Sequence, residues 1–156
     1  MPRVLVLCTH NSARSQMAEG WLRNLASRAG FPLEVWSAGT ERTRVKPEVL
    51  QVMAEEGMDL TAHFSKRLED VPDWERFDAV LTVCDAAARS CPVFPGETRR
   101  YHVSVPDPSG ESLERWHEVR DGLRGVCQTL VDALRQGQWP DPDRLRDSLP
   151  EALRRG

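Results

Sequence analysis

The sequence predicts a single α/β domain in which a four-stranded parallel sheet is flanked by helices. The chain has 156 residues, 40% of them hydrophobic and 29% charged, which suits one globular domain with a proper core. Apolar runs typical of strands alternate with stretches of helical spacing. Two such runs end directly on Cys8 and Cys84, and a third leads to Asp107. Because parallel strands present their carboxyl ends at one edge of a sheet, we expect these three residues to share that edge.

The first element is the strand Val4–Leu7, whose β-branched and leucine residues show no alternation and so indicate a buried strand. Helical spacing begins after Ser15, and the apolar residues on one side of that helix are Met17, Trp21, Leu22, Leu25 and Ala29. Cys8 and Arg14 therefore bracket a tight loop between a strand and a helix. Such a loop directs backbone N–H groups and the positive end of a helix dipole at one point, which favours an anion.

The side chains of this loop suit covalent chemistry on an oxyanion. A cysteine at a helix N-terminus beside an arginine favours the thiolate, which makes Cys8 the candidate nucleophile. The planar guanidinium of Arg14 can hold two oxygens of the anion, Ser15 can donate to the cysteine sulfur, and Asn11 can tie the loop to itself. The residues expected to bind the oxyanion are Thr9, His10, Asn11, Ser12, Ala13, Arg14 and Ser15. The C-x5-R pattern is short, so a buried structural cysteine with an unrelated arginine remains the alternative.

Turn and capping signals divide the rest of the chain. Strands are expected at 33–38, 77–83 and 100–105, and helices from Lys46 to a C-cap at Gly57, over 85–90, from about Ser112 to Arg135, and over 143–155. A turn at 70–74 leads into a further short helical piece. Cys127, on the apolar stripe of the long helix, is expected in the core, and His63 is expected to pack or to lie at the surface. Residues 1–156 form one domain in this interpretation, with 141–156 as a helical extension.

Cys84 and Cys91 flank the segment Asp85–Ser90, which has high helix propensity. A helix would hold the two cysteines about 10 Å apart along its axis, whereas a disulfide needs Cα atoms about 4.4–6.8 Å apart. The cysteines therefore cannot pair until the helix unwinds, so a redox reaction here would carry a local conformational change. Two alternatives stay open: two buried thiols, or a zinc site, although the sequence has no C-x2–4-C pair.

Asp107 lies in an Asp-Pro turn after the fourth expected strand. A carboxylic acid beside a reacting oxyanion can protonate the departing oxygen, which is the work of a general acid. The alternative is a turn with a structural role only, because Asp-Pro sequences are common in turns.

Composition excludes several classes of partner. The net charge of −3 gives no basic field for nucleic acid. No run approaches the roughly 18 apolar residues of a membrane span, and no signal peptide precedes Cys8. Four cysteines without the spacing of a secreted disulfide framework suit a reducing compartment, so we expect a cytoplasmic protein. The chemistry of the loop requires no metal, and we expect no cofactor.

Residues Cys8–Gly20, CTHNSARSQMAEG, resemble the phosphate-binding loop of the low-molecular-weight tyrosine phosphatase superfamily, and more narrowly of its thioredoxin-coupled arsenate reductase branch. The likeness extends along most of the chain. It implies one doubly wound, three-layer domain in which Ser37, within the SAGT element, helps to support the loop. Some members bind potassium through positions that match Asn11, Glu19 and Ser37, whereas the remaining ligand positions do not map clearly onto this chain.

The resemblance implies a redox mechanism on arsenate, with phosphate as its analogue. Cys8 attacks arsenate, Asp107 protonates the leaving oxygen, Cys84 attacks Cys8 with release of arsenite, and Cys91 then pairs with Cys84. Thioredoxin is the implied reductant of that last disulfide. Tyrosine phosphatases of the superfamily usually carry aromatic residues after the Asp-Pro pair and a second cysteine in the loop. Here Ser109-Gly110 follows and Ala13 replaces the cysteine, which favours a small substrate with no ring to stack.

Two other functions stay open from the sequence. A tyrosine or small-molecule phosphatase would use Cys8, Arg14 and Asp107 and hydrolyse a phosphocysteine, with no need for Cys84 or Cys91. An oxyanion-binding or thiol-sensing module would bind without turnover.

Overall fold

The computed structural model describes residues 1–94 and 96–154. Within these residues four strands form one sheet, in the order β2-β1-β3-β4, and all three neighbouring pairs are parallel. The strands are β1 (Arg3–Cys8), β2 (Glu34–Gly39), β3 (Ala79–Thr82) and β4 (Arg99–His102). The predicted fold class is confirmed. Among the described residues, none of the helices combines the length and apolar character needed to cross a membrane.

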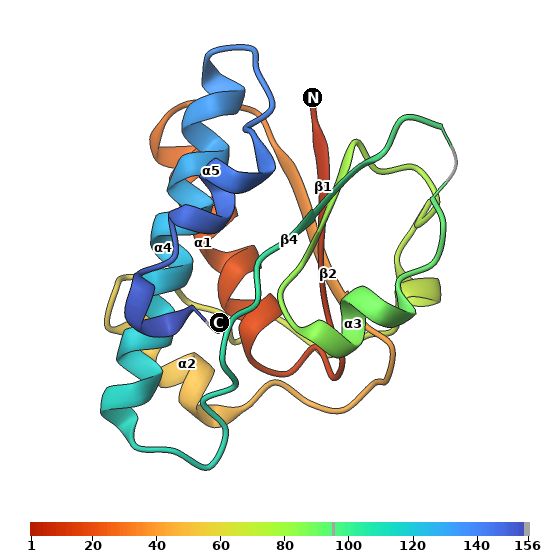
Figure 1. The fold of residues 1–156 in the computed structure, drawn as a ribbon. Coiled ribbons are helices and arrows are strands. Elements are labelled where there is room, and N and C mark those ends of the chain that lie inside the picture. Colours follow the sequence, from red (N-terminus) through yellow and green to blue (C-terminus); the bar gives the residue numbers. More distant parts are fainter. Residues whose placement is uncertain (95, 155–156) are drawn as a thin grey trace.

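Helices lie on both faces of this sheet (Figure 1). On one side α1 (Arg14–Arg28) packs against β1, β2 and α4 (Leu113–Arg135), and α2 (Pro47–Ala54) and α5 (Pro142–Asp147) pack around α4. The short helix α3 (Asp85–Ser90) lies on the other side, against β1 and β3. Single 3-10 turns occupy Leu68–Asp70 and Glu151–Leu153.

Helices α1 and α4 pack together, and each carries one of the two largest fully buried side chains of the core. Trp21 and Trp116 are both buried, and the Trp21 indole N–H donates to the carbonyl of Arg120 at 3.0 Å. Large aromatic side chains contribute most to the burial of apolar surface in such an interface. Cys127 is fully buried there, as predicted, and burial raises its pKa strongly, so it is a neutral core thiol.

Two expectations about short helices were wrong. The helix predicted over 143–155 is instead α5, which ends at Asp147, followed by a separate 3-10 turn; Pro150 lacks the N–H that a continuous helix would need. Arg155 lies outside the described residues. The helical piece predicted after residues 70–74 is a single turn that precedes them, at Leu68–Asp70.

The register of the sheet brings the ends of its strands together at one edge. Cys8 pairs with Gly39 on β2, and Leu7 pairs with Thr82 on β3. The loop after Cys8 therefore lies against the end of β2. A Cβ atom on Gly39 would come within 2.6 Å of the Thr9 carbonyl oxygen and 2.9 Å of the Asn11 nitrogen, so glycine alone permits this close approach.

Candidate active site

The loop after β1 turns its carbonyl oxygens away from the space that it encloses. Every carbonyl from residue 9 to residue 13 accepts a hydrogen bond of 2.8–3.1 Å from a donor outside that segment. The donors are Thr40 N and Glu41 N for Thr9, Thr43 Oγ1 and Ser65 Oγ for His10, Gln16 Nε2 for Asn11, Lys46 N for Ser12, and Met17 N for Ala13. Carbonyls directed outward leave the N–H groups of the loop to face an anion at the N-terminus of α1.

The nucleophile candidate, Cys8, lies at the end of β1 with 3% of its surface exposed. Its Sγ is 2.8 Å from the Oγ of Ser15, and that hydroxyl accepts a hydrogen bond of 2.8 Å from Nδ2 of Asn11. Because the Ser15 oxygen accepts on that side, its own proton is free to be donated to the sulfur, as a thiolate requires. Asn11 adopts a left-handed conformation with φ of 50°, which asparagine tolerates better than most residues.

Arg14 and Asp107 lie together at the rim of the loop. One guanidinium nitrogen of Arg14 donates to the carbonyl of Val105 at 2.7 Å, and the other is 3.7 Å from the Asp107 carboxylate. Burial by itself would raise the pKa of Asp107, but hydrogen bonds from Ser109 and the charges of Arg14 and Lys46 outweigh it and leave the pKa below its ordinary value. Asp107 must therefore gain a proton before it can act as a general acid. A bound oxyanion favours this, because it neutralises Arg14.

A pocket of about 420 Å³ opens above the loop. It is lined by Cys8, His10, Ser12, Ala13, Arg14, Thr43, Arg44, Lys46, Pro47, Asp107 and Ser109. None of these lining residues is Phe, Tyr or Trp, and three carry a permanent positive charge, so the pocket suits a small anion better than a phenyl ring. Arg44 and Lys46 were not predicted as site residues. They lie in a charged segment without secondary structure, and only the folded chain shows that this segment covers the pocket.

Cys84 lies at the same sheet edge as Cys8, as predicted. It is 5% exposed and caps α3, where its sulfur accepts a hydrogen bond from the Ala87 N–H at 3.4 Å. The same sulfur is 3.3 Å from the Thr9 hydroxyl, which belongs to the anion loop. Cys91 follows the last residue of α3 and is half-buried, so one helix length, about 10 Å, separates it from Cys84. All four cysteines lie in the described part of the chain and are free thiols.

Across residues 1–94 and 96–154, no three His, Cys, Asp or Glu side chains lie together in a way that could hold a metal ion.

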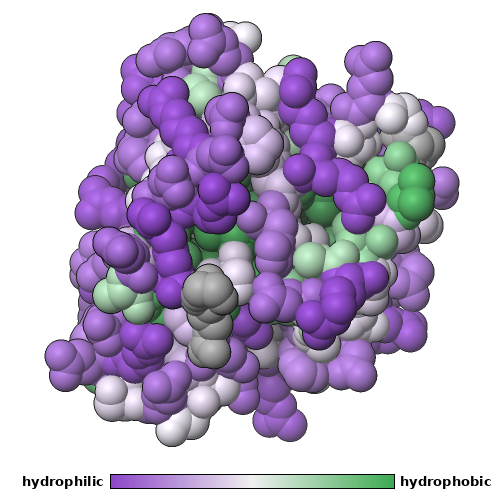
Figure 2. Space-filling model, viewed as in Figure 1, coloured by the Kyte–Doolittle hydropathy of each residue, from purple (hydrophilic) through white to green (hydrophobic). Residues whose placement is uncertain are grey.

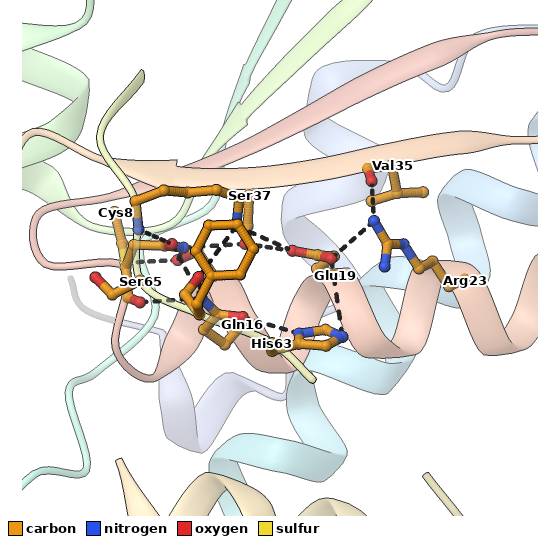
Figure 3. Close-up of polar contacts among 12 residues, drawn as sticks. Cys8, Gln16, Glu19, Arg23, Val35, Ser37, His63 and Ser65 are labelled. Atoms are coloured by element: carbon orange, nitrogen blue, oxygen red, sulfur yellow. Dashed lines mark hydrogen bonds and ion pairs between the residues drawn. The ribbon is translucent and has the colours of Figure 1, made fainter. Parts of the chain in front are cut away.

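A buried polar network lies behind the loop and connects it to α1 (Figure 3). Nδ2 of Asn11 donates to the Ser37 hydroxyl at 3.0 Å, and that hydroxyl donates to Glu19. Ser37 thus lies where it can support the loop. His63 is half-buried, with Nδ1 2.9 Å from the Gln16 amide oxygen. Burial lowers the pKa of His63 despite the nearby Glu19 carboxylate, which makes it a neutral packing residue at pH 7.

Comparisons with known proteins agree with this fold and loop. The profile of the family Low molecular weight phosphotyrosine protein phosphatase matches residues 3–139. Arsenate reductase 2 of Staphylococcus saprophyticus subsp. saprophyticus is 38% identical over 129 residues, 83% of this chain and 95% of that protein. A solved arsenate reductase in its phosphate-binding state superposes with a TM-score of 0.66 at 31% identity, over 85% of this chain and 98% of that one. A low molecular weight protein tyrosine phosphatase from T. tengcongensis superposes with a TM-score of 0.73 at 29% identity, over 88% and 99% of the two chains.

Proposed function

The chain belongs to the low molecular weight phosphotyrosine protein phosphatase family, and from this membership we propose that it reduces arsenate to arsenite. The position of Cys84 carries the proposal. Its buried sulfur contacts Thr9 of the anion loop, at the same sheet edge as Cys8, where a phosphatase has no need of a second thiol. Relatives named as arsenate reductases, identical at 35–38% of positions, support it.

In the first step the Cys8 thiolate attacks the arsenic atom of arsenate, which the loop N–H groups and Arg14 hold. A sulfur–arsenic bond forms and one arsenic–oxygen bond breaks. The departing group is the hydroxyl of the protonated arsenate, which takes a proton from Asp107 and leaves as water. The 3.7 Å separation between Arg14 and Asp107 supports these roles, because both side chains then border one tetrahedral anion.

In the second step the Cys84 thiolate attacks the Cys8 sulfur. A Cys8–Cys84 disulfide forms, the sulfur–arsenic bond breaks, and its electron pair stays on arsenic. Arsenic(V) becomes arsenic(III) and leaves as arsenite, while the two thiols supply the two electrons.

In the third step the Cys91 thiolate attacks Cys84 and frees the Cys8 thiolate for another cycle. The cysteines lie about 10 Å apart along α3, so this step requires α3 to unwind. The reductant proposed for the resulting disulfide is thioredoxin in a reducing cytoplasm. Next to Cys91, Val93 is 86% exposed, and Figure 2 shows apolar surface beside α3 on an otherwise largely hydrophilic face. This surface supports docking of a redox partner.

The test is arsenate-dependent consumption of NADPH in the presence of thioredoxin and thioredoxin reductase. Wild type should turn over, and Cys91→Ser should lose turnover because nothing releases Cys8 from its disulfide with Cys84. Cys127→Ser is the matched control and should retain turnover, since that sulfur is buried between α1 and α4. Absence of arsenate turnover in wild type, together with release of phosphate from phenyl phosphate, would contradict the proposal in favour of a phosphatase.

A phosphatase activity on small phosphate esters is the second candidate, because Cys8, Arg14 and Asp107 border the pocket without Cys84 or Cys91. Cys84→Ala with Cys91→Ala should abolish arsenate turnover and preserve hydrolysis of phenyl phosphate. Arsenate turnover in this double variant would exclude the relay.

A further inference from the structure

The carboxylate of Glu19 is buried behind the anion loop, with 3% of the residue exposed. In Figure 3 it lies among side chains from α1, β2 and the segment around residue 65. One carboxylate oxygen is 2.9 Å from the guanidinium of Arg23 and 3.9 Å from His63, and the other accepts the Ser37 hydroxyl and is 3.9 Å from Nζ of Lys66. Burial of a carboxylate is costly unless cations and hydrogen-bond donors compensate it, and the side chains around Glu19 provide both.

Lys66 contributes a buried cation to this environment. Only 6% of its side chain is exposed, and it is one of two lysines in the sequence. Its Nζ donates to the Phe64 carbonyl at 3.3 Å and lies 5.0 Å from the centroid of the Phe64 ring. Burial lowers the pKa of Lys66, and the Glu19 carboxylate opposes that effect, so the ammonium depends on this pairing. A compact ammonium fits such a site better than a guanidinium.

The backbone of Lys66 also supports the loop directly. Its N–H donates to Oδ1 of Asn11 at 3.0 Å, and its carbonyl accepts the N–H of Gly39 at 2.9 Å. One residue therefore contacts the loop through its backbone and the buried carboxylate through its side chain.

The potassium site implied by the family resemblance does not fit these residues. The Asn11 amide oxygen already accepts hydrogen bonds from the Lys66 N–H and from Nε2 of Gln16 at 2.9 Å. The Ser37 hydroxyl accepts from Asn11 and donates to Glu19. Arg23 and Lys66 already balance the single negative charge of Glu19, so a further cation would add unfavourable repulsion.

We propose that the Lys66 ammonium is the resident cation of this network and holds the anion loop in its binding conformation without an external monovalent cation. Lys66 fixes the Glu19 carboxylate, which accepts from Ser37, and Ser37 in turn accepts from Asn11. The other N–H of Asn11 goes to Ser15, whose proton is thereby directed at Cys8. Lys66 is thus a positioning residue, and the inference rests on the proposed function only in that the loop binds an oxyanion.

The test measures phosphate affinity and the thermal midpoint in potassium chloride and in tetramethylammonium chloride of equal ionic strength. Wild type should give the same midpoint, and phosphate affinities within about twofold, in the two salts. Lys66→Ala should bind phosphate about tenfold more weakly in the tetramethylammonium salt, and potassium or ammonium chloride should restore its affinity by filling the vacated space. Arg67→Ala removes an exposed cation one position away and should behave as wild type.

Three results would overturn the inference. Wild type could be more stable, or bind phosphate more tightly, in potassium chloride; Lys66→Ala could bind normally in the tetramethylammonium salt; or its weakened binding could resist rescue by either small cation. Lys66→Met, which keeps the apolar stem, replaces Lys66→Ala if the alanine variant does not fold. Both readouts are independent of arsenate reduction, and the thermal midpoint is independent of oxyanion binding, so failure of the proposed function would be recognised separately.

Discussion

The anion loop and helix α3 lie side by side at one sheet edge, yet they are held in very different ways. In the loop, Asn11 and Ser15 are fully buried, and all the carbonyls of residues 9–13 are hydrogen-bonded. Helix α3 has six residues, of which only Ala87 is buried. Its N-terminus is fixed by the Cys84 cap and by an exposed hydrogen bond of 2.8 Å between His102 and Asp85.

This contrast matches two different demands. The loop must present its donors in a fixed geometry to a charged transition state, and preorganised donors are effective because they do not reorganise during the reaction. In the relay, α3 must instead bring two sulfurs together from about 10 Å apart. A short helix with few buried contacts is at the low-stability end of a fold and opens at modest cost.

The largest effect should come from removing the centre of the loop. Asn11→Ala removes the side-chain hydrogen bonds that Asn11 makes with Ser15, Ser37, Gln16 and the Lys66 N–H, and it places alanine at positive φ. We expect a loss of about 2–4 kcal/mol in the free energy of unfolding and at least about a 100-fold fall in phosphate-ester hydrolysis. Urea denaturation and steady-state kinetics measure these. Asn24→Ala is the control, because within the described residues the Asn24 amide oxygen is buried without a partner. Equal losses in the two variants would contradict this account of the loop.

Asp107→Asn should affect chemistry at the loop and leave α3 alone. We expect kcat for phosphate-ester hydrolysis to fall about 10²–10³-fold with little change in phosphate affinity. Because the pKa of Asp107 without a bound anion is lowered, little of it is protonated at neutral pH, and the protonated fraction rises as pH falls. The rate of wild type should therefore increase toward acidic pH, and this increase should be absent in the variant. The rate of disulfide formation between Cys84 and Cys91 under a chemical oxidant should be unchanged. A slower disulfide would mean that the two regions are not independent.

Ala86→Gly should affect α3 and leave the chemistry at the loop unchanged. Ala86 is exposed, so the change lowers helix propensity by about 1 kcal/mol, which raises the unwound population about fivefold. We expect the Cys84–Cys91 disulfide to form about fivefold faster with phosphate-ester hydrolysis unchanged. Ala54→Gly, at an exposed position in α2, has a similar propensity cost and should leave the disulfide rate as in wild type. Equal rates in wild type and Ala86→Gly would mean that unwinding of α3 does not limit the relay.

Asp85→Asn should have the smallest effect. A hydrogen bond from His102 is the main cause of the lowered pKa of Asp85. A lowered carboxyl pKa stabilises the fold at pH values above the unfolded-state pKa of about 3.9, and this is lost as pH falls through the folded-state pKa. We expect the variant to be less stable than wild type by under about 1 kcal/mol at pH 7, because the pair is exposed, and equally stable at pH 2. Urea denaturation at both pH values checks this. A difference that persists at pH 2 would exclude the hydrogen bond between His102 and the Asp85 carboxylate as its cause.

The sequence predicted those features that depend on local physics. The buried run before Cys8, the helical spacing after Ser15 and the strand before Cys84 are local patterns, and sheet geometry then places both cysteines at one edge. The roles assigned to Cys8, Arg14, Cys84, Cys91 and Asp107 stay predictions.

Lys66 and Gly39 could not be recognised from the sequence, because their roles arise from contacts with Glu19, Thr9 and Asn11 across distant segments. A lysine in a polar connection is normally solvated, and only the tertiary pairing with a buried carboxylate reverses that expectation.

Hydrogen exchange on the amides of residues 8–15 and 85–91, before and after one turnover with arsenate in the absence of reductant, tests the central claim most directly. With saturating phosphate in both samples, so that the loop N–H groups stay hydrogen-bonded to an anion, we predict that residues 85–91 lose protection once Cys84 and Cys91 have paired, while residues 8–15 keep theirs. If residues 85–91 stay protected although mass spectrometry finds the Cys84–Cys91 disulfide, or if both regions lose protection together, the division into a fixed loop and a movable helix is wrong.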